Sequence, residues 1–276
     1  MIQLILEMFG YPFMVRAFIV GILVSLCASL LGTSLVLKRY SMIGDGLSHV
    51  GFAALAIAYA ANLAPLVVAI PVCVLAAFML LRMNDNSKIK GDAATALMCS
   101  GALAVGVMTV SLTTGMNTDV CNYMFGSILA MSKSDVKISI LLSVTVILLF
   151  VVFYQKIFAV TFDENFAKAT GTRSDLYNMI IALLTAVTVV LGMRMMGTLL
   201  ISSLIVFPSL SAMRICKKFK TVILNSVIIS VTCFCIGIFI SYEYSTPTGA
   251  SIVMANIVIF FALTVVERLK GKVTNK

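Results

Sequence analysis

The sequence of 276 residues has no tryptophan, a single histidine and few charged residues, which make up 11% of the chain. This low charge and a hydrophobic fraction of 61% exclude a water-soluble globular protein. Because tryptophan is absent, the chain must be anchored at the membrane surfaces by tyrosine, phenylalanine, lysine and arginine. The formal net charge is +9, but the basic residues gather at the ends of apolar runs, as membrane topology requires. We therefore expect no nucleic-acid partner.

Several patterns that carry chemistry are also missing. The chain has no G-x-x-x-x-G-K-[ST] motif to hold nucleotide phosphates, so any ATP hydrolysis must belong to another polypeptide. It has no H-E-x-x-H motif, which argues against an intramembrane metalloenzyme. Its seven cysteines form no C-x-x-C pair and are expected to be packing residues rather than disulfides. We predict neither an enzyme nor a permanently bound cofactor.

Long apolar runs predict an all-α polytopic membrane protein, a bundle of eight or nine transmembrane helices in one domain over residues 1–276. We expect the chain to lie in the cytoplasmic membrane. If the basic clusters are placed in the cytoplasm, the N-terminus lies on the outer side of this membrane and the C-terminus on the cytoplasmic side. The predicted spans are 12–37, 43–62, 64–82, 92–114, 135–155, 175–193, 196–213, 221–242 and 249–267.

The second predicted span contains the most informative pair of residues. Asp45 precedes His49, the only histidine, by four residues within an otherwise apolar stretch that is rich in glycine and alanine. On a helix these two side chains share a face, and together they form half of a site for zinc, manganese or iron. Small residues favour burial of this helix in the bundle. The alternative is a hydrogen bond between the two side chains that only rigidifies the helices.

Two other acidic residues are candidates for a metal path. Asp119 lies in the connection 115–132, which is too polar and too short to span and is expected to be re-entrant or interfacial. Glu243 lies at the outer end of a span.

A separate expectation concerns Pro208, which with nearby serines predicts a broken helix beside a cavity.

A short amphipathic segment is predicted on the cytoplasmic side. Thr161 followed by Glu164 is a capping-box pattern, and Gly171 is placed to end the helix. An apolar stripe of Phe162, Phe166 and Ala169 suits either a groove in a partner protein or the bilayer surface.

Four stretches together resemble the permease subunits of zinc and manganese ABC importers. They are Lys38–His49, Phe162–Gly171, Gly197–Pro208 and Thr246–Ser251, and the resemblance covers nearly the whole chain. It implies a type II-like permease that pairs with a second copy of itself, a cytoplasmic ATPase and an extracytoplasmic metal-binding protein. It also implies that Asp45 and His49 are metal ligands. The residues that it assigns to ATPase coupling are Phe162, Asp163, Glu164, Phe166, Ala167 and Gly171.

We therefore predict a permease subunit that carries a divalent transition metal, zinc or manganese with iron as a further option. What completes the coordination stays open between Asp119, Glu243 and water. The alternative is a secondary cation carrier driven by an ion gradient, in which Asp45 exchanges protons.

Overall fold

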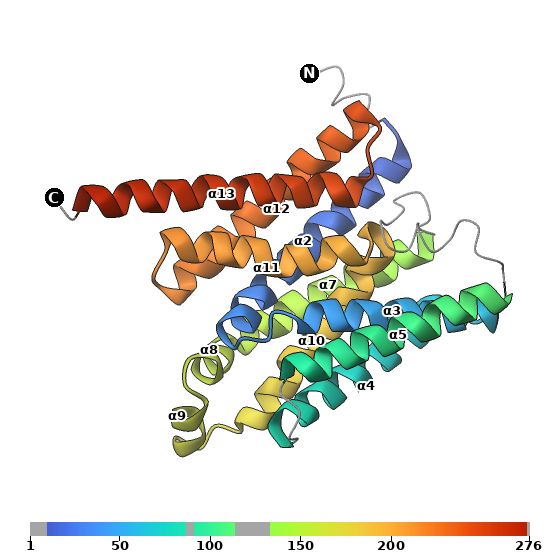
Figure 1. Cartoon of the computed structure of the whole chain (residues 1–276), viewed down its shortest axis with the longest axis horizontal. Coiled ribbons are helices and arrows are strands. Elements are labelled where there is room, and N and C mark those ends of the chain that lie inside the picture. Colours follow the sequence, from blue (N-terminus) through green and yellow to red (C-terminus); the bar gives the residue numbers. More distant parts are fainter. Residues whose placement is uncertain (1–9, 87–90, 114–132, 275–276) are drawn as a thin grey trace.

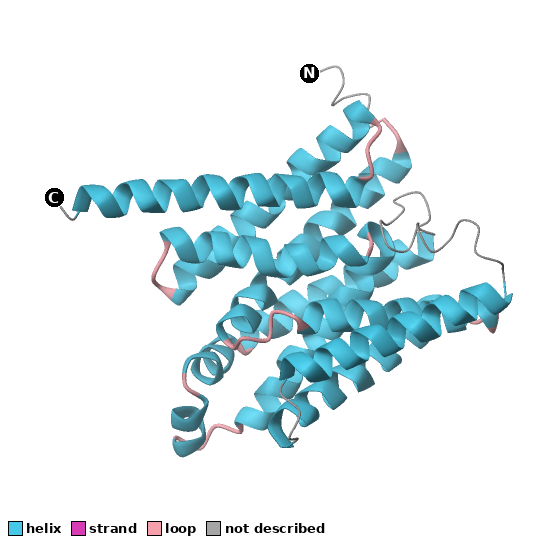
Figure 2. Ribbon diagram, viewed as in Figure 1, coloured by secondary structure: helices cyan, strands magenta, loops and turns pink. Residues whose placement is uncertain are grey.

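The computed structural model describes residues 10–86, 91–113 and 133–274, and helices joined by short connections make up this part of the chain (Figure 2). Nine of these helices are long and apolar enough to cross a membrane, whereas α8 and α9 are short. This confirms the all-α membrane fold and, in the described ranges, favours nine spans over eight. The helices are α2 (Pro12–Leu37), α3 (Ile43–Ala60), α4 (Pro65–Asn86), α5 (Gly91–Thr113), α7 (Lys133–Val152), α8 (Tyr154–Phe162), α9 (Glu164–Ala169), α10 (Ser174–Met196), α11 (Thr198–Ile215), α12 (Phe219–Tyr244) and α13 (Thr248–Thr274).

The central helix of the bundle is α2, which packs against α7, α10, α11 and α12. On one side of it, α3, α4 and α5 pack together, and α10 contacts both α3 and α4 (Figure 1). On the other side, α11, α12 and α13 form a second group. This arrangement surrounds α3 with α4, α5, α10 and α11, so most of its residues are buried, as its small side chains predicted.

Hydroxyl groups join α2 to its neighbours α11 and α12. The Thr33 and Ser209 hydroxyl oxygens lie 3.4 Å apart, and those of Ser209 and Ser226 lie 3.2 Å apart. Farther along, the Ser230 hydroxyl donates to the main-chain carbonyl of Ser25 at 3.1 Å. Small hydroxyl residues let membrane helices approach closely and hydrogen-bond across the contact, so these three helices form one tightly packed unit.

The proline within α11 does not break the helix, so the expectation of a broken helix there was wrong. Pro208 lies inside a continuous helix from Thr198 to Ile215. A hydroxyl from the next residue, Ser209, donates to the Ile205 carbonyl at 3.2 Å, and α2, α3, α10, α12 and α13 pack against the helix. The interruption falls instead at Gly197, whose φ of 85° separates α10 from α11.

Several cytoplasmic features that the sequence predicts lie toward the same end of the molecule. In Figure 1, α8, α9, the connection between α11 and α12, and the C-terminal end of α13 lie toward the left. Basic residues accompany them, including Lys156, Lys168 and Lys217. The orientation across the membrane and the single-domain organisation stay predictions, and the connection 115–132 falls outside the described residues.

Candidate metal centre and coupling segment

The two predicted ligands lie at the start of α3, just after the turn that follows α2. Asp45 and His49 project from one face of this helix, and Asp45 Oδ2 lies 3.8 Å from His49 Nε2. That distance is too long for a hydrogen bond. The two side chains therefore lie close together without a direct hydrogen bond between them. The Asp45 carboxylate also lies in the first turn of α3, where the helix dipole favours a negative charge.

A third donor comes from α5, which packs along α3. The Cys99 thiol, the Asp45 carboxylate and the His49 imidazole each offer one ligand atom, and the three atoms lie within 4.8 Å of one another. Gly46 permits this close packing, because a β-carbon there would lie 3.0 Å from a methyl carbon of Thr95 and 3.7 Å from Cys99 Sγ. The glycine next to Asp45 thus allows α5 to bring its thiol to the pair on α3.

The three donors fit a divalent transition-metal ion. Two ligand atoms of one tetrahedral zinc ion lie about 3.5 Å apart, so side-chain movements of about 1 Å would suffice for all three to bind. Carboxylate, imidazole and thiolate are all ligands of such metals. The His49 side chain is 21% exposed and that of Asp45 35%, while Leu47 and Ser48 between them are buried. Both candidate ligands are therefore partly accessible, on a helix whose other faces are packed.

The other two sequence candidates do not join this group. Glu243 is exposed near the end of α12, a helix of the opposite half of the bundle, and is not among the three clustered donors. Asp119 lies outside the described residues. For the part of the chain that the structure describes, the donor beside Asp45 and His49 is the Cys99 thiol.

Sequence reasoning missed Cys99 and treated it as a packing residue. Fifty residues separate it from His49, and no local motif distinguishes it from the other cysteines in apolar spans. A weak signal was present in Gly46, because a glycine beside a candidate ligand predicts that another helix approaches there.

Residues 162–171, which the resemblance assigns to ATPase coupling and which are called the coupling segment below, have a different start from the one that the sequence predicted. Thr161 lies inside α8 and does not cap the next helix. Asp163 is the N-cap of α9, and its Oδ1 accepts a hydrogen bond of 2.9 Å from the Phe166 amide. The prediction of a capping box at Thr161 was therefore wrong, because α8 continues through this residue to Phe162 and the next helix is capped by Asp163.

The end of the segment agrees with the prediction. Gly171 has a φ of 81°, and its amide donates to the Lys168 carbonyl at 3.0 Å. The next amide, that of Thr172, donates to the Ala167 carbonyl at 2.9 Å. This pair of hydrogen bonds is the Schellman motif, which ends a helix at a glycine with positive φ. Gly171 therefore terminates α9 as predicted.

The three side chains of the predicted apolar stripe are largely exposed. Phe162 is 58% and Phe166 66% exposed, and Ala169 is also exposed. Ala167, in contrast, is buried and anchors α9 to the rest of the chain. Phe166 and Ala169 are thus available to another surface, whereas the exposed Phe162 ring also contacts the rings of Phe158 and Phe219, at centroid distances of 4.9 Å and 5.7 Å.

The Glu164 carboxylate is the polar anchor of α9. Its partial burial acts to raise the pKa, but the Asn178 hydrogen bond, the Lys38 charge and the Lys168 and Lys38 hydrogen bonds outweigh this, so the pKa is lowered. Glu164 is therefore ionised at neutral pH. The stability that it contributes is fully present above the ordinary carboxyl pKa and is lost only as the pH falls through the lowered value.

Comparison with known proteins identifies the family. The family model described as the ABC 3 transport family matches residues 10–267, nearly the whole chain. The chain belongs to the ABC 3 transport family. This finding confirms the resemblance to metal ABC permeases, and the chain is a multi-pass membrane permease of the ABC transporter type.

Named relatives of this ABC 3 permease align over almost their whole length. It is 29% identical over 250 residues to the manganese import system permease protein ScaB of Streptococcus gordonii, which covers 91% of this chain and 90% of the relative. It is 32% identical over 262 residues to a Haemophilus influenzae membrane protein named for an iron transport system, which covers 94% and 92%. The solved structure of PsaBC from Streptococcus pneumoniae in complex with a Fab matches with a TM-score of 0.86, at 28% identity over 95% of each chain.

Proposed function

We propose that this ABC 3 permease imports a divalent transition-metal ion, manganese or zinc with iron as a further option, and that Asp45, His49 and Cys99 form its translocation site. The observation that carries the proposal is the convergence of three metal-binding side chains, from two membrane-spanning helices, within 4.8 Å. Ionisable groups inside a membrane are costly and normally line a substrate path. The metal is the cargo, so its ligands must release it as well as bind it.

A second copy of the chain would complete this path. His49 and Asp45 are partly exposed on the single chain, and a carboxylate facing lipid would be strongly unfavourable. The neighbouring helix α5 also presents exposed Leu97, Val105 and Met108. An apolar surface around a polar opening fits a homodimer whose two metal sites face a shared path.

The energy would come from a separate cytoplasmic ATPase. The chain has no phosphate-binding motif, and the coupling segment presents Phe162 and Phe166 outward, as an amphipathic helix in a partner's groove does. Asp163 and Gly171 hold this segment in a defined shape at its two ends. An extracytoplasmic metal-binding protein would deliver the ion. Nucleotide-driven movement of α9 would then open the paired bundles alternately to the two sides of the membrane.

Uptake by the assembled transporter tests this function. The chain is reconstituted in liposomes with its ATPase and metal-binding protein, and accumulation of radiolabelled manganese, zinc and iron is measured with and without ATP. We expect ATP-dependent accumulation of one of these ions. Accumulation by the chain alone under a proton gradient, without ATP, would instead identify an ion-driven secondary carrier.

The Cys99 thiol should influence which metal is preferred. Thiolate is a soft ligand that suits zinc better than manganese. We expect Cys99→Ser to weaken zinc binding about 10- to 100-fold and manganese binding by no more than about threefold, by analogy with the loss of single groups around metal sites. Isothermal titration of the purified chain with each metal measures both. Cys235→Ser is the matched control, because Cys235 is half-buried on α12, away from the site. Equal losses for both metals would show that the thiol does not select between them.

A further inference from the structure

Lys38, the residue that ends α2, lies where four helices meet. Its side chain is only 7% exposed. A lysine ammonium has three N–H donors, and here they reach acceptors on three different helices. Lys38 Nζ donates to the Val160 carbonyl of α8 at 3.3 Å, to Glu164 Oε2 of α9 at 3.2 Å and to Asn178 Oδ1 of α10. One buried charge therefore joins α2 to both the coupling segment and the helix beside it.

The acceptors around Lys38 also hold one another in place. Asn178 Nδ2 donates to the same Glu164 oxygen at 3.2 Å, so Lys38, Glu164 and Asn178 form a closed triangle. The other oxygen of Glu164 pairs with Lys168 at 3.1 Å. Removal of the Lys38 charge would leave a partly buried carboxylate without its buried partner, which makes the link costly to break. α9 is thus tied to α2 by directional, charge-assisted contacts.

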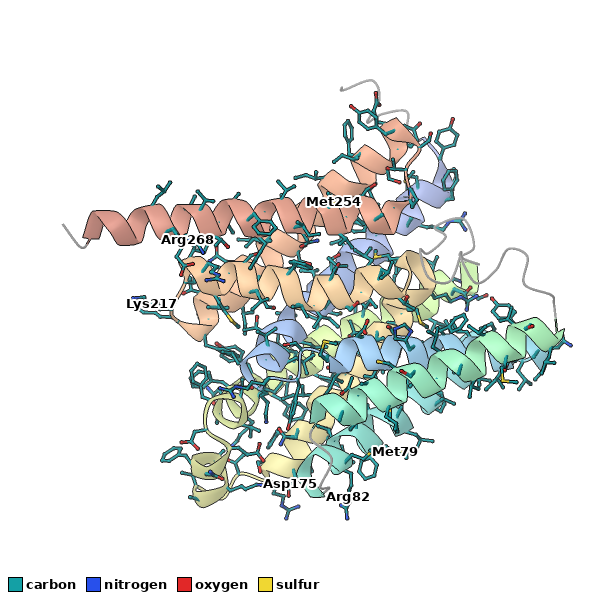
Figure 3. The ribbon with its side chains drawn as sticks, in the orientation of Figure 1. Met79, Arg82, Asp175, Lys217, Met254 and Arg268 are labelled. Carbon is teal, nitrogen blue, oxygen red and sulfur yellow. The ribbon has the colours of Figure 1, made fainter. Side chains whose placement is uncertain are left out.

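A cavity lies beside this link, between α9 and the metal-binding half of the bundle. The cavity has a volume of about 870 Å³ and lies between α4, α9 and α10. Phe78, Leu81 and Arg82 of α4 line one wall, with Glu164 and Asn178 opposite. Figure 3 shows Arg82 and Asp175, which also lines the cavity, at the same end of the molecule. Because this space lies between α9 and α4, α9 meets the metal-binding half of the bundle through α10 and through Lys38 rather than by close packing on α4.

The main chain from Lys38 to the metal site is a closed turn. Arg39 has a φ of 61°, and the Tyr40 amide turns back to donate to the α2 carbonyl five residues earlier at 2.8 Å. The Ile43 amide then donates to the Tyr40 carbonyl at 3.0 Å and starts α3. Lys38 Nζ also lies 6.0 Å from the centre of the Tyr40 ring, within cation–π range. A displacement of Lys38 is therefore passed on to the start of α3, where Asp45 lies.

We propose that Lys38 is a positioning residue that transmits movement of the coupling segment to the metal site. When the ATPase moves α9, Glu164 pulls on the Lys38 ammonium, and the closed turn carries this displacement to Asp45 and His49. The inference rests on the proposed function, because it needs a moving coupling segment and a metal site on α3. Lys38 itself contacts neither the metal nor the ATPase in this scheme.

The test compares transport with hydrolysis in the assembled transporter. Lys38→Met removes the charge and keeps much of the side-chain length, Lys38→Arg keeps the charge, and Lys156→Met is the matched control because Lys156 is exposed on α8. Each variant is reconstituted with the ATPase and the metal-binding protein, and metal uptake and ATP hydrolysis are measured per assembled complex. For Lys38→Met we expect hydrolysis to continue while the metal moved per ATP falls about tenfold, a typical size for lost coupling between sites. Lys38→Arg keeps the charge but not the compact geometry of the ammonium, so it should retain more coupling than Lys38→Met, and Lys156→Met should stay within about twofold of the wild type.

The outcomes separate the link from the function on which it rests. A normal ratio of metal to ATP in Lys38→Met, with working wild-type transport, overturns the link alone. A wild type that hydrolyses ATP without moving any of the three metals overturns the proposed function. If Lys38→Met does not assemble, Lys38→Gln retains hydrogen-bond donors without the charge and takes its place. Failure of both to assemble would make Lys38 a folding contact and also overturn the proposal.

Discussion

His49→Ala is expected to reduce metal uptake by more than about 100-fold, since loss of groups that merely support metal ligands already costs about 10- to 100-fold. His49 supplies the only imidazole of the chain, and its Nε2 lies 3.8 Å from Asp45 Oδ2 and within 4.8 Å of the Cys99 thiol. Without the imidazole, two donors remain, both of which would be anions when bound to a metal. Uptake of radiolabelled metal by the reconstituted transporter measures the effect, and co-purification of the ATPase verifies assembly.

The role of the Asp45 carboxylate is tested by comparing metal uptake in Asp45→Asn with uptake in Glu243→Gln. Both substitutions replace an acid by its amide, but Asp45 lies in the cluster on α3 and Glu243 is exposed near the end of α12. We expect Asp45→Asn to abolish uptake and Glu243→Gln to leave it unchanged. The reverse pattern would move the ion path to the α12 side of the bundle, and normal uptake by both variants would mean that transport does not need the Asp45 carboxylate.

Gly32→Ala is expected to destabilise the chain more than other single-methyl additions. Gly32 lies on α2 against α11, and a β-carbon there would lie 2.0 Å from the Ile205 carbonyl oxygen and 2.8 Å from the Ser209 hydroxyl. Because the first of these atoms is backbone, the helices must separate, which also stretches the hydroxyl contacts between α2 and α11. Overpacking of this kind costs roughly 3 kcal/mol, equivalent to a fall of about 5 to 10 °C in Tm for a chain of this size.

The control for Gly32→Ala is Gly101→Ala, the same substitution within α5. A β-carbon at Gly101 would have no atom of the same chain within 4 Å, so in the isolated monomer this variant should unfold at the wild-type temperature or slightly above it, since alanine is the better helix former. Thermal unfolding of both purified variants in the same detergent provides the measurement. Equal Tm values for the two would show that α2 and α11 separate without cost, and the close approach would then contribute nothing to stability.

Local sequence patterns were sufficient to predict the helices and to place Asp45 and His49 on one helix face. Apolar run length and turn residues predicted the nine spans with ends close to those observed; the first, 12–37, coincides with α2. Spacings within one helix were also predictive of the structure, because a four-residue interval puts Asp45 and His49 on one face of any α-helix. Gly171 ended α9 as predicted for a similar reason, since the positive φ of a glycine at a helix end is a local property of the backbone.

The helix breaks show where local patterns were insufficient. Pro208 suggested an interruption, yet neighbouring helices and hydroxyl groups keep α11 continuous. Thr161 and Asp163 are both acceptable N-caps by residue type, and the continuation of α8 through Phe162 selected Asp163. In both places the deciding interaction comes from packing, which spacing along the chain does not encode.

The sequence by itself determined that this is a multi-span permease with a carboxylate and an imidazole on one helix face. Only the tertiary structure decided that Cys99 joins them and that Lys38 connects α9 to the start of their helix. The physical reason is the distance along the chain between the residues that interact. Residues four apart are held together by helix geometry, whereas the Cys99 and Lys38 contacts join helices whose approach depends on small residues such as Gly46 and on one buried charge.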